Sequence, residues 1–176
     1  MLWIISDLGK AGSFLPAFVD SLFDLIERAR PRRMIIDLRM MTRGSDGFQE
    51  HLMPRLLESH LISRGPGRII ALVGPRTLSS GTWALASLVR DANAVVIGEP
   101  TGQGINHFGN TQTLQALSIG SLVYSSSALI QIDESKSNRR DPDIRVPRWG
   151  SDYFEGRDPA LEEALSLPLP VHDLSR

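Results

Sequence analysis

The chain has 176 residues, of which 41% are hydrophobic and 22% charged, and its formal net charge is −1. This length provides for one domain with a hydrophobic core, and the near-neutral charge excludes the strong positive field used to attract nucleic acid or an anionic membrane. The chain contains no cysteine, which excludes disulfides, thiolate metal sites and cysteine nucleophiles.

The N-terminal part of the chain alternates between predicted strands and predicted helices. Residues 2–6 (LWIIS) form a short apolar run, and apolar residues at helical spacing then predict a helix over 14–30. The run MIIDL (34–38) predicts a second strand, apolar on successive residues as in a parallel sheet covered on both faces. Rows of apolar residues four apart predict another helix over 47–62.

The same alternation continues towards residue 100. RIIALVG (68–74) predicts a third strand, Ser79 and Ser80 open the next helix, and AVVIGE (94–99) predicts a fourth strand. Strands that alternate with helices in this way predict an α/β fold with a parallel central sheet and right-handed crossovers.

The C-terminal part has a different character. Glycine and asparagine crowd residues 101–110, and β-rich runs follow at 113–117 and 121–132. A polar, exposed loop is expected over 133–143. The residues DPALEEAL (158–165) predict a last helix, with an aspartate N-cap and proline at its first position.

The organisation of the whole chain is simple. We find no internal repeat and no dividing linker, so we expect one domain over residues 1–176 with a loosely packed tail at 166–176 and no PDZ-like module. The opening apolar run spans five residues and lacks a basic n-region, so no signal peptide is predicted. No stretch approaches the length of a membrane span.

The start of the third predicted helix is the first candidate site. In TLSSGT (77–82), Ser79 and Ser80 lie at a strand-to-helix turn, where N–H groups and the helix dipole stabilise negative charge. Serine acyl-transfer chemistry needs such a hydroxyl and N–H donors for the oxyanion. The alternative is that one of these serines simply caps the helix, which is the commoner use of this pattern.

A second candidate segment, residues 35–47, follows the second strand. Its turn contains Gly44, whose backbone N–H group would point into a cleft at the carboxyl end of the sheet. The alternative is that Asp37 and Arg39 form a structural pair and that Gly44 only serves a turn.

The third candidate segment is VIGEPTGQGINHFGN (96–110), in which the glycines indicate a sharp turn or a close approach. It lacks the lysine and the following helix of a phosphate loop, so nucleotide binding is not expected. His107 is the one histidine near a plausible site, as a base or as an ordinary hydrogen-bonded group.

No metal site and no cofactor are predicted, because His51, His60, His107 and His172 are scattered without ligand spacing. The basic cluster of Arg28, Arg30, Arg32 and Arg33 is interpreted as the solvated end of a helix, since no aromatic residues are interleaved for nucleic acid.

Taken together and in this order, the segments resemble the catalytic core of the tail-specific (C-terminal-processing) serine proteases. That family includes the tricorn-protease core and non-proteolytic retinoid-binding modules. The matching pieces span about residues 34–165: MIIDLR with a glycine turn, ALVGPRTLSSGTWALASL, AVVIGEPTGQGINHFGN, DPDIRV and GRDPALEEAL. The resemblance implies a ClpP/crotonase-like fold of repeated ββα units.

The resemblance also implies roles for individual residues. It makes Ser79 the nucleophile, with Ser80 beside it, and assigns oxyanion binding to the N–H groups of Gly44 and of the serine pair. The glycine-rich segment would contact the substrate, with Gly102, Gly104 and Asn106 as candidates.

The sequence departs from the family pattern in three places. Met41 and Arg43 stand where the family has asparagine and glycine, and Thr82 stands where it often has an acid. The lysine of the Ser-Lys branch is missing after GEPT. In the tricorn-like branch a histidine from an upstream segment serves as the base, so we expect an upstream base first and His107 second.

Two functions remain open at this stage. The first is a serine peptidase that cuts peptides or proteins near their C-terminus through an acyl-enzyme, as a homo-oligomer or with a missing N-terminal segment. The second is a catalytically inactive binding module of the same fold. A third possibility, a crotonase-like acyl-CoA enzyme, shares the fold but is not favoured, and it would require the chain to bind CoA. The compartment is not identified, although members of the family are often exported.

The two leading functions predict different structures. A working site predicts a cleft in which Ser79 faces the N–H group of Gly44 with a base within reach. A degenerate site predicts that the Ser79 side chain forms a cap bond and that Met41 or Arg43 fills the cleft.

Overall fold

A computed structural model describes residues 2–4, 15–42, 47–62, 69–116, 120–132 and 141–168. Its centre is a five-stranded sheet in the order β1-β2-β3-β4-β7, and each neighbouring pair of strands is parallel. The strands are β1 (Leu2–Ile4), β2 (Met34–Asp37), β3 (Ile69–Val73), β4 (Val95–Gly98) and β7 (Ile144–Arg145). The predicted α/β fold with a parallel central sheet is confirmed, and β7 is an additional short strand. The division into ClpP/crotonase-like ββα units stays a prediction.

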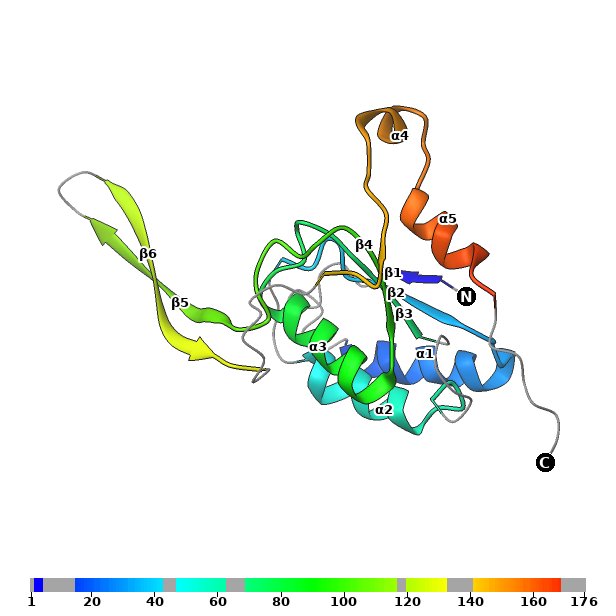
Figure 1. The fold of residues 1–176 in the computed structure, drawn as a ribbon. Coiled ribbons are helices and arrows are strands. Elements are labelled where there is room, and N and C mark those ends of the chain that lie inside the picture. Colours follow the sequence, from blue (N-terminus) through cyan, green and yellow to red (C-terminus); the bar gives the residue numbers. More distant parts are fainter. Residues whose placement is uncertain are drawn as a thin grey trace.

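Helices return the chain between the first four strands and cover one face of the sheet (Figure 1). They are α1 (Leu15–Ala29), the π-helix η3 (Phe48–Leu52) with its continuation α2 (Met53–Glu58), and α3 (Ser80–Ala92). The opposite face carries α5 (Pro159–Ser166), and the short helix α4 (Gly150–Phe154) protrudes between β7 and α5 (Figure 1). The predicted helices are present, whereas the π-helical turn and α4 were not predicted.

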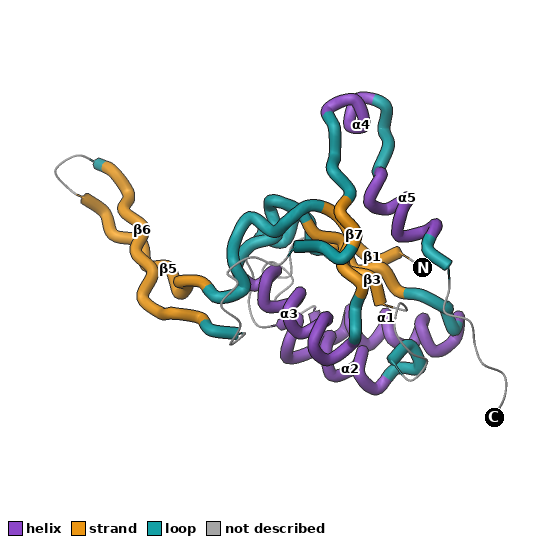
Figure 2. The backbone as a smooth tube through the Cα atoms, in the orientation of Figure 1, coloured by secondary structure: helices purple, strands orange, loops and turns teal. Residues whose placement is uncertain are grey.

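Alternate strand residues supply two separate hydrophobic cores. Ile36, Ala71 and Val96 belong to the larger cluster, together with residues of α1, α2 and α3. Ile35 and Ile70 belong to the smaller cluster, on the side of α5. Successive strand residues point to opposite faces of a sheet, so a strand covered on both sides is apolar at every position. The layers on the two faces are visible in Figure 2.

Arg33 does not follow the prediction for the basic cluster, which placed it at a solvated helix end. Its relative exposure is only 9%. Its guanidinium donates hydrogen bonds of 2.8 Å to the carbonyls of Ala164 and Leu167 and one of 3.2 Å to that of Pro168. The last carbonyls of a helix lack intrahelical donors. Arg33 therefore supplies hydrogen-bond donors to the carbonyl groups at the C-terminal end of α5. The prediction of a solvated side chain is wrong for this residue.

A two-stranded antiparallel hairpin, β5 (His107–Ala116) and β6 (Ser121–Ile130), extends away from the sheet (Figure 1). β5 begins six residues earlier than the predicted run at 113. Neither strand contains Asp, Glu, Lys or Arg. Several large apolar side chains of the hairpin are exposed: Phe108, Leu114, Leu122, Val123, Tyr124 and Leu129.

Within the described ranges, no helix is both long enough and apolar enough to cross a membrane. Most of the predicted polar loop and of the predicted tail lies outside the described residues.

Candidate active site

The turn from β3 into α3 holds Ser79 in an unusual backbone conformation. Ser79 is the N-cap residue of α3, with φ 51° and ψ −119°. Residues other than glycine rarely adopt a positive φ, and such conformations cost about 1–3 kcal/mol each. The Ser79 side chain makes no capping hydrogen bond. The capping alternative requires that bond, so the geometry leaves the Ser79 hydroxyl available for another role.

Hydrogen bonds to the end of β2 hold this turn in place. The Thr77 hydroxyl donates to the Leu38 carbonyl at 3.0 Å and accepts from the N–H group of Gly74 at 3.1 Å. The N–H group of Leu78 donates to the carbonyl of Met41 at 3.0 Å. The segment that leads to Ser79 is thus fixed to residues 38–41, and a strained backbone conformation persists only where the surrounding structure holds it.

Met41 is buried beneath the start of α3 and does not line a cleft. Its relative exposure is 0%, and it belongs to the larger hydrophobic core. A Cβ atom on Gly81 would lie 2.5 Å from the Met41 carbonyl oxygen, so only glycine allows this close approach. Arg43 and Gly44 lie outside the described residues, and the oxyanion role of Gly44 stays a prediction.

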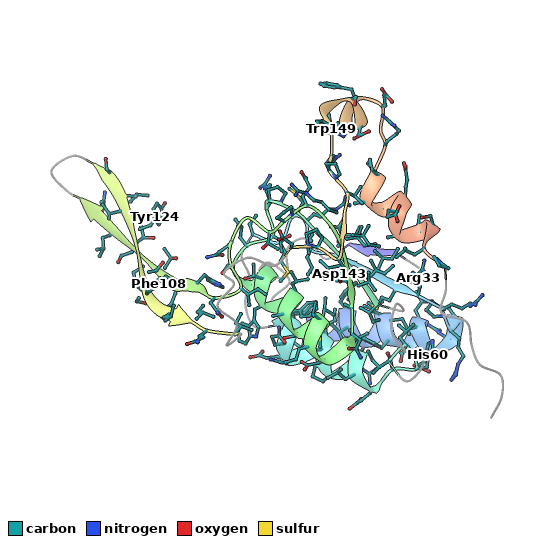
Figure 3. The ribbon with its side chains drawn as sticks, in the orientation of Figure 1. Arg33, His60, Phe108, Tyr124, Asp143 and Trp149 are labelled. Carbon is teal, nitrogen blue, oxygen red and sulfur yellow. The ribbon has the colours of Figure 1, made fainter. Side chains whose placement is uncertain are left out.

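Ser79 lines an open cleft with a volume of about 590 Å³ between the β3–α3 turn and the hairpin. The body of the protein contributes Thr42, Leu78, Ser79 and Gln103, and the hairpin contributes Phe108, Gly109, Asn110, Thr111, Thr113 and Tyr124. Figure 3 shows Phe108 and Tyr124 on the projecting hairpin. Among the described residues that line the cleft there is no histidine, lysine or carboxylate.

Backbone N–H groups at the start of α3 differ in their partners. Those of Gly81 and Thr82 donate to the carbonyls of Leu78 and Ser79, each at 2.9 Å. The N–H group of Ser80 has no acceptor within the described part of the chain. Ser80 is not among the residues that line the cleft, and its oxyanion role stays a prediction. The Ser80 hydroxyl is buried and, among the described residues, has no hydrogen-bond partner.

His107 lies at the base of the hairpin, at 8% relative exposure. Its Nδ1 atom is 3.1 Å from the Gly104 carbonyl oxygen and 3.0 Å from that of Ile105. Both oxygens are acceptors, so Nδ1 carries the proton. Nε2 is buried and has no partner among the described residues. His107 is not part of the lining of the Ser79 cleft, so the structure does not bring the two side chains into one cleft.

The predicted substrate contacts lie around the cleft and are not part of its lining. A Cβ atom on Gly102 would lie 2.0 Å from the carbonyl oxygen of Pro75, so this glycine packs against the segment that leads to Ser79. The Gly104 carbonyl oxygen accepts a hydrogen bond from His107 Nδ1. The Asn106 side chain accepts a hydrogen bond of 2.9 Å from the Ile132 N–H group. The residue of this loop that does line the cleft is Gln103, which sequence reasoning missed.

Asp37 and Arg39 form the structural pair of the alternative interpretation. The Arg39 guanidinium donates to the Asp37 carboxylate at 2.9 and 2.6 Å, and to the Asp158 carboxylate at 2.7 and 2.8 Å. The hydrogen bond to Asp37 raises the pKa of Arg39 above its usual range. The hydrogen bond from Arg39 lowers the pKa of Asp158, which is the N-cap of α5 as predicted. Over the described residues, no group of three or more His, Cys, Asp or Glu side chains is placed to hold a metal ion.

Comparisons with known proteins bear on the fold. The sequence matches no protein-family model, and no curated protein matches it significantly. A candidate peptidase from Parabacteroides merdae has a TM-score of 0.67 at 18% identity, over 97% of this chain and 61% of that one. The tricorn protease has a TM-score of 0.57 at 21% identity, over 93% of this chain and 17% of that one. A lipoprotein from Streptococcus agalactiae has a TM-score of 0.54 at 14% identity, over 94% of this chain and 64% of that one.

The chain therefore spans less than two thirds of the length of each of these proteins. At such low identities the likeness concerns the fold alone. The conclusion is that this chain has a mixed α/β fold similar to that of peptidases such as the tricorn protease.

Proposed function

We propose that this chain is the core domain of a serine-type peptidase and that Ser79 is its nucleophile. The observation that carries the proposal is the strained strand-to-helix turn, which places Ser79 at the start of α3 and in the wall of the cleft without a capping bond. A strained backbone that the surrounding structure holds in place is typical of functional sites. The fold shared with peptidases supports the same assignment.

The reaction would follow the chemistry of serine acyl transfer. Ser79 Oγ forms a bond to the peptide carbonyl carbon while its proton passes to a general base. The carbonyl π electrons move to the oxygen, which the Ser80 N–H group and, by resemblance, that of Gly44 stabilise. The C–N bond then breaks, and the amine leaves with the proton from the base. Water hydrolyses the resulting ester and restores the Ser79 hydroxyl.

The general base would come from residues outside the described ranges or from another chain or segment. A serine hydroxyl without a base is a poor nucleophile near neutral pH. The described lining of the cleft supplies none, and the Nδ1 atom of His107 is held by backbone carbonyls outside that lining. An upstream histidine, as in the tricorn-like branch, is the first choice, and a rearranged His107 is the second.

The substrate would be an extended peptide lying between the β3–α3 turn and the hairpin. Uncharged polar side chains of Thr42, Asn110, Thr111 and Thr113 line the cleft there. Such groups suit a peptide backbone, and an edge strand of the hairpin offers unpaired N–H and C=O groups for β-augmentation. The resemblance to the C-terminal-processing family suggests cleavage near the C-terminus of the substrate.

A second candidate function is a binding module that keeps the fold without the chemistry. The absence of a base from the described lining of the cleft favours it. Such a module would bind peptides in the same cleft, and replacement of Ser79 would leave their affinity unchanged.

A fluorophosphonate probe distinguishes the two candidates. We expect the probe to label Ser79 of the full-length protein, as located by peptide mass spectrometry, and Ser79→Ala to abolish labelling. Ser87→Ala is the matched control, because Ser87 is a second serine of α3 but is buried in the core side of the helix. If the folded protein remains unlabelled from about pH 5 to pH 9 while it binds peptides by calorimetry, the binding module is the better assignment.

A further inference from the structure

The side chain of Gln103 contacts the backbone of Ser79. The N–H group of Ser79 donates a hydrogen bond of 2.6 Å to Gln103 Oε1, across 24 positions of sequence. Gln103 comes from the loop after β4, and its side chain lines the same cleft as Ser79. The glutamine amide is thus fixed at the residue whose hydroxyl is the proposed nucleophile.

The chemistry of this contact fixes the orientation of the amide. A backbone N–H group only donates, so the atom that faces it must be the oxygen, and the other end of the amide is the NH₂ group. Nε2 carries two donor hydrogens and, within the described part of the chain, has no hydrogen-bond partner. The amide oxygen of Gln103 is therefore engaged by the Ser79 N–H group, and the free donor end of the amide belongs to a residue that lines the cleft.

The loop that carries Gln103 is held at Thr101 and Gly102, the residues directly before it. The buried hydroxyl of Thr101 donates to the Gln103 carbonyl at 2.8 Å. Gly102 packs so closely on Pro75 that a Cβ atom would lie 2.0 Å from its carbonyl oxygen. A hydrogen-bond donor that is already held in place does not have to reorient when negative charge develops on the substrate oxygen. Such preorganisation is what allows a donor to stabilise a transition state.

Two backbone donors are proposed for the oxyanion, the N–H groups of Ser80 and of Gly44, and Gly44 lies outside the described residues. The Ser79 N–H group is engaged by Gln103, and the Ser80 N–H group is the open backbone donor among the described residues of this turn. An oxyanion is commonly held by two donors, of which one can be a side-chain amide. We propose that Gln103 Nε2 donates a hydrogen bond to the carbonyl oxygen of the scissile peptide and to the oxyanion derived from it. This role rests on the proposed function and adds a catalytic residue to it.

Gln103→Glu tests the donor separately from the contact with Ser79. A carboxylate of the same shape still accepts from the Ser79 N–H group but has no hydrogen to donate. We expect the rate of fluorophosphonate labelling to fall about 100-fold, since removal of one oxyanion donor typically costs 10²–10³ in rate. The melting temperature should stay near that of the unmodified protein. Gln103→Met, uncharged and without a donor, should show a similar fall in rate.

Gln112→Glu is the matched control, because Gln112 is exposed on β5 and does not line the cleft. Labelling of Gln103→Glu at the rate of Gln112→Glu would overturn the donor role and leave the proposed function intact. Absence of labelling in the unmodified protein would overturn the proposed function, and this role with it.

A measurement on the unmodified protein covers the case in which the variants do not fold. A peptide boronic acid forms a tetrahedral adduct with an active serine and mimics the oxyanion. The side-chain ¹H–¹⁵N signals of Gln103 should shift downfield when the adduct forms. If the adduct forms and these signals do not move, Gln103 is not the donor.

Discussion

Arg39, which follows the end of β2 at Asp37, binds the carboxylate of Asp158, the N-cap residue of α5, through hydrogen bonds of 2.7 and 2.8 Å. The same guanidinium binds Asp37, whose side chain is only 8% exposed. One side chain thus joins the central sheet to the helix that covers its second face. The arrangement also keeps a buried carboxylate paired, since an unpaired buried charge is strongly destabilising.

Replacement of Arg39 by methionine should destabilise the fold by about 3 kcal/mol, because it leaves the buried Asp37 carboxylate without its partner. Urea unfolding at neutral pH measures this loss. Arg90→Met is the matched control, since Arg90 pairs with Asp91 but is 62% exposed. Exposed pairs contribute about 0–1 kcal/mol, so equal losses in both variants would contradict the structural role of Arg39.

Asp158→Asn should make stability less sensitive to acid. The bond from Arg39 holds the pKa of Asp158 below its usual value in the folded state, so the pair stabilises the fold above the unfolded pKa of about 3.9. That stabilisation is lost as the pH falls through the folded pKa. Asparagine keeps the capping ability, so the variant isolates the ion pair.

We therefore expect Asp158→Asn to cost about 1 kcal/mol at neutral pH, as for a partly exposed ion pair, and progressively less as the pH falls below the unfolded pKa of about 3.9. Urea unfolding across this pH range measures both values. The idea fails if the difference between the two proteins is independent of pH.

Ser79→Gly should raise stability while it removes the proposed nucleophile. Glycine adopts the positive φ of residue 79 without a Cβ penalty, so we expect a gain of about 1 kcal/mol. Thermal unfolding measures the gain, and Ser79→Ala is the control, because alanine removes the hydroxyl but keeps the Cβ atom. A glycine variant no more stable than the alanine variant would show that the turn stores no strain.

Gly102→Ala should damage the site without a change in any side chain that lines it. The new Cβ atom would meet backbone, at 2.0 Å from the Pro75 carbonyl oxygen, so the segment that leads to Ser79 must move. We expect a loss of about 1–3 kcal/mol, as for overpacking in a core, and a weaker reaction with the fluorophosphonate. Gly150→Ala is the control, since no atom lies within 4 Å of its added Cβ. Wild-type behaviour of Gly102→Ala would disprove the close approach.

Arg33→Met should destabilise α5 specifically. The variant loses the donors to the carbonyls of Ala164 and Leu167, and hydrogen bonds to charged groups contribute about 1.5–3 kcal/mol. Hydrogen exchange would then show earlier opening of α5 than of α1. Arg32→Met is the control, because Arg32 is exposed. Uniform loss of protection, or none, would argue against this role.

Much of the fold follows from local patterns in the sequence. The strand IIALV (β3) is apolar at every position because both of its faces are covered. Ser79, Ser80 and Asp158 stand at the starts of helices, where they were expected. By contrast, the two-residue strand β7 is too short for any periodicity. The buried state of Arg33 depends on where α5 ends in space, 131 positions later in the chain, so composition near Arg33 carries no sign of it.

The candidate site divides in the same way. The sequence by itself determined that a serine pair opens the helix after the third strand, because turn and capping chemistry act over a few residues. Only the tertiary structure decided that residues of the hairpin line the cleft and that His107 is not among the lining residues. It also decided that Gln103 Oε1 accepts a hydrogen bond from the Ser79 N–H group. Those relationships depend on which loops lie together at the carboxyl edge of the sheet. Packing between segments that are distant in the sequence determines this, because local conformational preferences act over only a few residues.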